Sequence, residues 1–388
     1  MVGREREGSD LDALAAATRS RCATGASFRA ARRPFAVAAL GVAATLPLFL
    51  GRASSAMENL VLAAAYVVMA LGLNVVVGFA GLLDLGYVAF FAIGAHVAAY
   101  FASAFWANAA GGAGVALLVG PPAAGTPGIH LNFLIVLVLA IIATTTIGVL
   151  IGVPTLRVRG DYVGMVTLAF GEIIGQLVSN GSDIHFLGGS LTGGPSGITG
   201  IDRIDLPIAG RFDALDLRPW YWFALTLAAL TLLVNFRLRD SRVGRAWMAL
   251  RDDERAAASA GVPIVRTKLL AYGVGAALGG VSGAFLASYL GTVDPSQFTF
   301  SFSIFILTMV VLGGLGSIWG VVLGAVVLSA ITNYLLHDLP SNLGLDLSEI
   351  SSGVYGFLLV IVMLLRPGGL LPGPRRTMAA SVLGRRDA

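Results

Sequence analysis

Long apolar stretches recur along almost the whole chain, and they constrain its fold more than any other feature. A transmembrane helix needs about 20 mostly apolar residues, within a range of roughly 17–25. Ten stretches meet this description, approximately at residues 34–50, 59–78, 85–105, 132–154, 161–180, 219–236, 268–290, 302–318, 319–337 and 351–366. The sequence therefore predicts an all-α polytopic integral membrane protein with about ten transmembrane helices. Several stretches are short or interrupted by glycine, so we expect broken or re-entrant helices among them.

The composition agrees with this class. Hydrophobic residues make up 56% of the 388 residues and charged residues 12%, whereas a soluble domain has about 25% charged residues. The 50 glycines suit close packing of helices in lipid. The net charge of +4 comes largely from segments that flank the apolar stretches, so it does not indicate a nucleic-acid partner. Cys22 is the only cysteine, which excludes an intrachain disulfide and a cysteine-based metal site.

Basic residues gather in segments that predict an orientation. Residues 1–33 are polar and Arg-rich, and further basic clusters follow the fourth, sixth and tenth predicted spans. Because Arg-rich loops stay in the cytoplasm, this spacing places every cluster on the cytoplasmic side. We therefore expect a cytoplasmic tail over 1–33, a transmembrane domain over 34–366 and a second cytoplasmic tail over 367–388. Residues 181–218 then form the longest outward loop.

The outward loop has the composition of an ordered or semi-ordered connection. Its segment SLTGGPSGITGIDRID is rich in Gly, Pro, Ser and Thr, which are residues of turns. A contact with an external partner and a purely connecting role both remain open for it.

Two glycine-rich segments form a weak internal echo. Gly78-Phe-Ala-Gly81 precedes one span, and Gly313-Gly-Leu-Gly316 precedes another. Internal repeats are common in transporters. The spacings that follow the two segments differ, so a true repeat is left open.

The cytoplasmic loop 237–268 is the only long, charge-dense segment between hydrophobic stretches. Asp253 and Glu254 lie where the positive N-terminus of a short helix favours acids, and Gly261 lies just past its predicted end. We expect about two helical turns here, held by a partner on that side. Trp247 and Leu250 are three residues apart and share a helix face. The pair is expected to insert into a protein groove or, alternatively, into the bilayer interface.

Signatures of enzymes are mostly absent from the sequence. No phosphate-binding loop of the type G-x-x-x-x-G-K-[ST] occurs, and Lys268 is the only lysine. Two acids stand out at membrane depth, Asp84 and Glu172. Such groups are costly in lipid and usually face a cavity, a partner or the bundle interior. They are candidates for the transport pathway, although Asp84 could instead cap the following helix. Two acids are thin support for a proton-coupled transporter.

Six blocks of the sequence resemble a known family. They are GFAGLLDLGYVAFFAIGAH at 78–96, RGDYVGMVTLAFGEII at 159–174, LTGGPSGI at 191–198, SRVGRAWMALRDDERAAASAGV at 241–262, MVVLGGLGSIWGVVLGA at 309–325 and LLRPGGLLP at 364–372. Together and in order, they resemble the inner-membrane permease subunits of branched-chain amino-acid ABC importers, of the LivM type. The block at 241–262 is similar to the loop that couples such permeases to the ATPase, although Arg255 interrupts its E-A-A-like pattern.

The resemblance implies a function, partners and a location. It implies an ATP-driven importer of leucine, isoleucine and valine that works by alternating access in the bacterial inner membrane, with both termini cytoplasmic. A second related permease, two cytoplasmic ATPases and a soluble substrate-binding protein are the implied partners. ATP and Mg would be bound by the ATPases, and this chain itself would carry no cofactor, no metal and no catalytic residue.

The candidate site residues fall into two sets. The coupling set is Arg245, Trp247, Leu250, Asp253, Glu254 and Gly261, and the candidate pathway set is Asp84, Tyr87, Thr167 and Glu172. Importers of urea or short amides share the architecture and remain an alternative, although the segment LLDLGYVAF favours the amino-acid branch. A secondary transporter without ATPases and, more remotely, an intramembrane enzyme complete the alternatives.

Overall fold

The computed structural model describes residues 41–52, 54–107, 114–117, 127–158, 162–186, 189–206, 210–332, 351–366 and 368–371. The chain divides into two compact units, Met1–Gly51 and Arg52–Ala388. In the first unit, residues 41–49 are helical. The predicted tail 1–33 lies outside the described residues, as do part of the predicted span 34–50 and most of the predicted tail 367–388.

Apolar helices form the second unit. They are α2 (Ser55–Leu73), which continues as the π-helix η1 (Asn74–Phe79), α3 (Val88–Phe101), α4 (Phe133–Thr155), α5 (Tyr162–Asn180), α6 (Arg218–Asp240), α9 (Ile264–Leu290), α10 (Phe300–Gly313), α11 (Ile318–Ala330) and α13 (Ser351–Leu365). Every predicted span from 59–78 onward overlaps one of these helices. The predicted fold class, a mostly helical polytopic membrane protein, is therefore confirmed.

The helices differ in length as the sequence predicted. Among the described residues, five are long and apolar enough to cross a membrane: Ser55–Phe79, Phe133–Thr155, Tyr162–Asn180, Arg218–Asp240 and Ile264–Leu290. Helix α3 has 14 residues, which corresponds to about 21 Å against a hydrocarbon thickness of about 30 Å. Helices α10 and α11 are similarly short. The short elements end at irregular segments, which are tolerated at membrane depth only where protein surrounds them.

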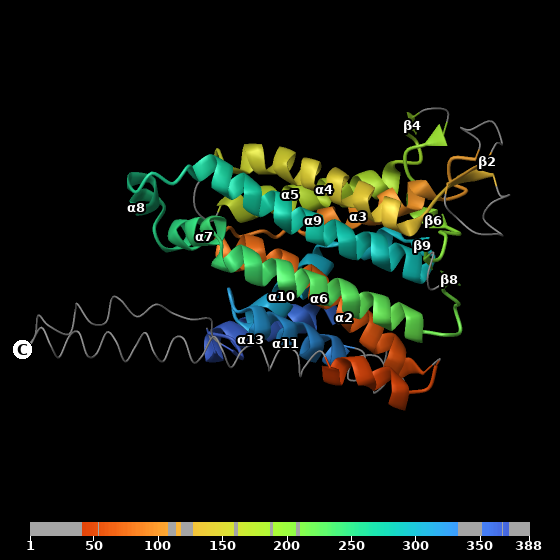
Figure 1. Cartoon of the computed structure of the whole chain (residues 1–388). Coiled ribbons are helices and arrows are strands. Elements are labelled where there is room, and N and C mark those ends of the chain that lie inside the picture. The colour runs from red at the N-terminus through yellow and green to blue at the C-terminus, as the bar shows by residue number, and fades with distance from the viewer. Residues whose placement is uncertain are drawn as a thin grey trace, which may run out of the picture. The chain divides into compact units, whose positions relative to one another are not determined.

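Helices α2 and α9 occupy the interior of this unit. Helix α9 packs against α2, α3 and α4, and α2 packs against α6, α10 and α11 (Figure 1). Helices α3 and α9 touch through glycine, since a Cβ added at Gly94 would lie only 2.5 Å from the Cα atom of Gly280. Small residues let helix backbones approach in this way when no hydrophobic effect drives them together. By contrast, α4 is apolar on all sides and exposes Val138, Ile142 and Leu150, as a lipid-facing helix does.

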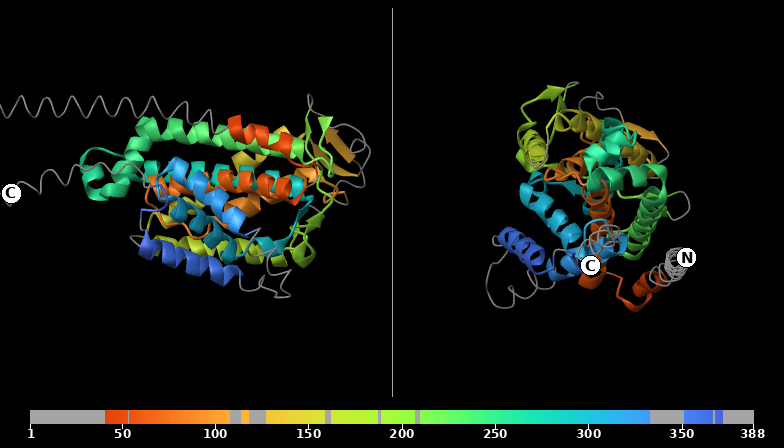
Figure 2. Two further views of the ribbon diagram at one scale, coloured as in Figure 1. Left: turned by 90° about the horizontal axis from the view of Figure 1, so that it is seen from below. Right: turned by 90° about the vertical axis from the view of Figure 1, so that its left-hand side faces the viewer.

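Short strands gather at one end of these helices, which we call the strand end (Figures 1 and 2). Strands β1 (Ala102–Ser103), β3 (Gly128–Leu131) and β2 (Gly114–Leu117) form one sheet in that order. The remaining pairs are β4 (His185–Phe186) with β5 (Gly189–Ser190), β6 (Ile198–Thr199) with β9 (Thr292–Val293) and β7 (Asp205–Leu206) with β8 (Gly210–Arg211). The 3-10 turn η2 (Gly194–Ser196) precedes β6 in sequence, and the 3-10 turn η3 (Pro295–Gln297) follows β9. These strands were not predicted, although the turn composition of 181–218 was recognised.

The opposite end carries two further helices, α7 (Arg242–Asp252) and α8 (Glu254–Ser259) (Figures 1 and 2). We call it the α7–α8 end. The predicted loop 237–268 is therefore largely helical, since α6 runs to Asp240 and α9 begins at Ile264. Only the second of its two short helices was predicted.

Candidate functional site

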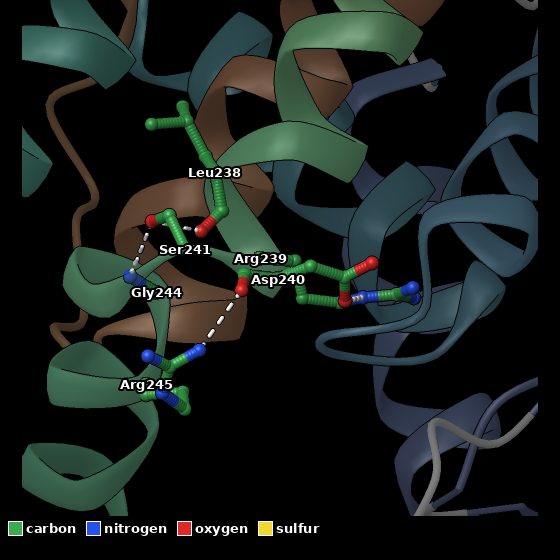
Figure 3. A network of polar contacts seen from close by, with 6 residues as sticks. All are labelled: Leu238, Arg239, Asp240, Ser241, Gly244 and Arg245. Atoms are coloured by element: carbon green, nitrogen blue, oxygen red, sulfur yellow. Dashed lines mark hydrogen bonds and ion pairs between the residues drawn. The ribbon is translucent and has the colours of Figure 1, made fainter.

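The turn from α6 into α7 is fixed by three hydrogen bonds (Figure 3). The Ser241 hydroxyl donates to the Leu238 carbonyl at 2.6 Å and accepts from the Gly244 amide at 3.1 Å. Ser241 is thus the N-cap of α7, a position where a side-chain oxygen satisfies an otherwise unpaired helix amide. The guanidinium of Arg245 donates to the Asp240 carbonyl at 3.0 Å. Arg245 therefore braces the bend rather than pointing away from the chain.

Helix α8 is stabilised at both ends. The Asp253 carboxylate accepts from the amides of Arg255 at 2.8 Å and Ala256 at 3.0 Å, and these two hydrogen bonds lower the pKa of Asp253 below its ordinary value. Gly261 ends the segment with φ of +83°, a conformation that costs a residue with a side chain roughly 1–2 kcal/mol. Apart from the buried Ala257, the residues of α8 are exposed. The helix has the predicted caps and presents an outward surface.

An ion pair connects α8 to α9. The Glu254 carboxylate lies 2.8 Å from the Lys268 ammonium group. The Lys268 side chain is 14% exposed and the Glu254 side chain 52% exposed. Since Lys268 belongs to the second turn of α9, a displacement of α8 is opposed by a contact to a central helix of the bundle.

Trp247 and Leu250 are buried within the chain, at 0% and 6% exposure. The indole Nε1 of Trp247 donates to the Thr267 carbonyl at 2.7 Å. The expectation that this pair inserts into a partner's groove or the bilayer interface is therefore wrong. Their shared helix face was predicted correctly, but it packs against the protein itself because the rest of α7 turns its charged side outward.

Three of the four candidate pathway residues lie together in the interior. The Thr167 hydroxyl accepts from the Leu85 amide at 3.0 Å, and the Asp84 carboxylate accepts from the Gly86 amide at 3.0 Å. The Tyr87 hydroxyl donates to the Gly275 carbonyl at 2.8 Å. Asp84 and Thr167 are 2% exposed and Tyr87 is fully buried. These contacts connect the irregular residues 80–87 to α5 and α9, so the three side chains shape the bundle without lining an open surface.

The fourth candidate, Glu172, stands apart from this cluster. It lies on the exposed face of α5, together with Met165, Ala169 and Gln176, whereas Thr167 lies on the buried face. Residues spaced by three or four share one face of a helix, so the carboxylate and the Gln176 amide sit one turn apart on the same side. Asp84 differs in being buried, and in the described part of the chain no hydrogen-bond partner satisfies the second oxygen of its carboxylate.

Two contacts at the α7–α8 end were missed by the sequence analysis. Arg251 donates a hydrogen bond to the Gly78 carbonyl, and the Asn74 side chain accepts from the Gly316 amide at 2.9 Å. In the sequence, these contacts were indicated by the two similar glycine-rich segments around residues 78 and 316. Within the described residues, no group of three or more His, Cys, Asp or Glu residues is placed to hold a metal ion.

Comparison with known proteins identifies the family. Residues 55–363 match the family described as branched-chain amino acid transport system / permease component. The chain is 36% identical over 365 residues to the high-affinity branched-chain amino acid transport system permease protein LivM of Salmonella typhimurium, across 88% of this chain and 75% of that protein. The probable branched-chain amino acid transport permease protein LivM of Methanocaldococcus jannaschii is 26% identical over 249 residues, across 61% of this chain and 68% of that protein.

A second type of permease is also similar. The high-affinity branched-chain amino acid transport system permease protein LivH of Escherichia coli is 31% identical over 155 residues, across 40% of this chain and 46% of that protein. No solved structure matches the chain significantly. The family match runs from the start of α2 into α13, and the chain therefore belongs to the family of permease components of branched-chain amino acid ABC transport systems, multi-pass membrane subunits that are not themselves enzymes.

Proposed function

We propose that this chain passes leucine, isoleucine and valine across the bacterial inner membrane by alternating access, driven by ATP that partner subunits hydrolyse. The observation that carries this proposal is the similarity to permeases named for branched-chain amino acid transport, which extends over 88% of the chain. ATP and Mg would bind to two cytoplasmic ATPases, because the sequence has no phosphate-binding loop of its own.

The α7–α8 end supports a coupling role. Helix α8 is exposed, capped by Asp253 and tied to α9 by the Glu254–Lys268 ion pair. A helix transmits force only when it is both accessible to a partner and anchored to what it must move, and α8 meets both conditions. We therefore assign the ATPase contact to the exposed residues of α8, with Arg245, Trp247 and Leu250 as its internal support.

The exposed face of α5 supports a contact with the second permease. A carboxylate that faces hydrocarbon costs about 2.5–3.5 kcal/mol on insertion scales, and Glu172 gains no compensating hydrogen bond from the described residues. The cost is avoided if a protein surface or a water-filled passage covers this face. We assign that covering to a second related permease, similar to LivH, with Glu172 at the passage between the two subunits.

Orientation is part of the proposal. The basic clusters favour a cytoplasmic α7–α8 end and cytoplasmic termini, with the strand end facing an external substrate-binding protein. In a Cys22→Ser background, cysteines replacing Arg245 and Arg376 should react with an impermeant reagent only from the cytoplasm. A cysteine replacing Asp205 should react only from outside. Labelling at position 245 in intact cells would reverse the assignment.

Transport by the whole complex tests the function. Vesicles that contain this chain, the second permease, the ATPases and the binding protein should accumulate leucine, isoleucine and valine only when ATP is supplied to the ATPase side. Uptake of urea without uptake of these amino acids would show that the chain belongs to an importer of urea or short amides. Uptake by the permeases without the ATPases would support a secondary transporter instead.

A further inference from the structure

Two glycine segments that lie far apart in sequence meet at the α7–α8 end. Residues 78–81 span the end of η1 and the start of the irregular segment before α3, and residues 313–316 join α10 to α11. The Asn74 side chain connects them, since its oxygen accepts from the Gly316 amide at 2.9 Å. We call residues 78–81 and 313–316 the glycine breaks, because each interrupts two successive apolar helices. The two glycine breaks are therefore held against each other at one point.

Arg251, from the last turn of α7, occupies this meeting point. Its Nη1 atom donates to the Gly78 carbonyl. A Cβ added at Gly81 would lie 2.7 Å from the arginine Cγ, and one added at Gly316 would lie 2.8 Å from Nη1. Gly81 and Gly316 also have positive φ angles, of +70° and +81°. We call the recess formed by Gly78, Gly81 and Gly316 the glycine cradle. A side chain at Gly81 or Gly316 would displace the arginine, and one at Gly78 would displace the Asn74 side chain that bonds to the Gly316 amide.

The charge of Arg251 suits this position. The last carbonyls of a helix lack partners within the helix and carry partial negative charge. The Gly78 carbonyl lies at the end of the continuous helix α2–η1, so a guanidinium is a favourable cap there. The hydrogen bond is charge-assisted, and such bonds are about twice as strong as neutral ones.

The same helix is anchored at a second point. Trp247 of α7 donates to the Thr267 carbonyl of α9, one turn before Arg251 reaches η1. Helix α7 thus contacts both interior helices of the bundle, α9 directly and α2 through η1. A movement of α7 cannot leave the two glycine breaks in place unless the Arg251 contact is lost.

From this arrangement, we infer that Arg251 is a positioning residue that transmits displacement of the α7–α8 segment to the α2–α3 and α10–α11 breaks. The inference rests on the proposed coupling of this segment to an ATPase. Arg251 does not touch the substrate; it acts through the Gly78 carbonyl and, by way of Asn74, through Gly316. Binding of the ATPases does not depend on it, whereas conversion of hydrolysis into transport does.

The test compares three variants in the complete complex, with substrate transported per ATP hydrolysed as the readout. Arg251→Met should leave co-purification of the ATPases unchanged and lower this ratio about tenfold, as expected for loss of a charged hydrogen bond. Arg251→Lys should recover much of the ratio, because it keeps a cationic donor. Arg242→Met is the matched control, since Arg242 is an exposed arginine at the other end of α7, and it should retain the wild-type ratio.

A chemical rescue isolates the charge. In a Cys22→Ser background, Arg251→Cys should lose transport per ATP, regain it with an aminoethyl thiosulfonate, which adds an ammonium group, and stay low with the neutral methyl reagent. A wild-type ratio in Arg251→Met would overturn the inference, and so would loss of ATPase co-purification in that variant, since the arginine would then hold the complex together. Failure of the unmodified chain to co-purify with ATPases would instead overturn the proposed function.

Discussion

The indole of Trp247 and the carbonyl of Thr267 are joined by a 2.7 Å hydrogen bond that fixes α7 against α9. Trp247→Ala should destabilise the protein by about 3–5 kcal/mol, because it removes a fully buried aromatic side chain. Trp247→Phe keeps most of the packing and loses the donor, so a cost of about 1 kcal/mol is expected. Thermal unfolding of the detergent-solubilised protein measures both, and equal midpoints for the two variants would argue against the packing role.

Reversing the charge at position 254 should lower the amount of substrate transported per ATP while changing the stability of the protein only slightly. Glu254→Lys places a second cation beside Lys268 and a positive charge at a helix N-terminus, which is unfavourable by a few tenths to about 1 kcal/mol. We expect lower substrate transport per ATP in the inserted complex. The exchange variant Glu254→Lys with Lys268→Glu restores opposite charges. If transport per ATP stays low although this double variant assembles, the partner contacts the Glu254 side chain itself, and the ion pair with Lys268 is not what coupling requires.

A β-branched residue at Gly261 should distort the end of α8. The positive φ is unfavourable by roughly 1–2 kcal/mol for a residue with a side chain, and nothing lies within 4 Å of an added Cβ, so the whole cost comes from the backbone. Gly261→Val is expected to reduce ATPase association or transport per ATP. Gly261→Asn is the control, because asparagine tolerates this conformation better than other residues. Normal co-purification and coupling in Gly261→Val would contradict the docking assignment of α8.

Acid should loosen the start of α8 through Asp253. Hydrogen bonds from the Ala256 and Arg255 amides lower its pKa from the ordinary 3.8. A group whose pKa is lower in the folded state contributes stability above its unfolded pKa and loses it as the pH falls through the folded pKa. Hydrogen exchange should therefore show constant protection of these two amides above pH 3.8 and a decline below it. Asp253→Ala should lose this protection at all pH values, whereas Asp253→Asn should abolish the decline below pH 3.8, because asparagine has no carboxylate to protonate.

Neutralising Glu172 should slow uptake without disturbing assembly. Glu172→Gln keeps the size and hydrogen-bonding capacity of the side chain but removes the charge that we place at the passage between two permeases. Gln176→Glu, one turn further along the same face, serves as a matched variant that adds a charge. Initial uptake rates of the reconstituted complex measure the effect, and a wild-type rate for Glu172→Gln would place the residue at the periphery.

The spans could be predicted because a helix that lies in lipid needs a long apolar stretch of sequence, whatever packs around it. Each predicted stretch from 59–78 to 351–366 overlaps an observed helix. The two ends of α8 could also be predicted, because Asp253 and Gly261 act through local backbone geometry. Local rules of this kind need no knowledge of what packs nearby.

Burial could not be read in the same way, because it depends on contacts between distant segments. Trp247 looked available to a partner, yet it donates to a carbonyl 20 residues further along the chain. Asp84 and Glu172 looked alike as acids at membrane depth, but one is buried and the other exposed. The helix face shared by Trp247 and Leu250 was predicted, but the extent of α7 was not, and neither was the packing of its narrow apolar face, formed by Gly244, Trp247 and Leu250, against the protein itself.

The pairing of Lys268 with Glu254 has a practical consequence for labelling. Since Lys268 is the only lysine in the chain, an amine-reactive reagent has a single side-chain target, and that target is 14% exposed while it is paired. Its rate of acylation therefore reports how often α8 separates from α9. The native sequence thus carries a built-in reporter at the segment that we assign to the ATPase, and no introduced probe is required to follow it.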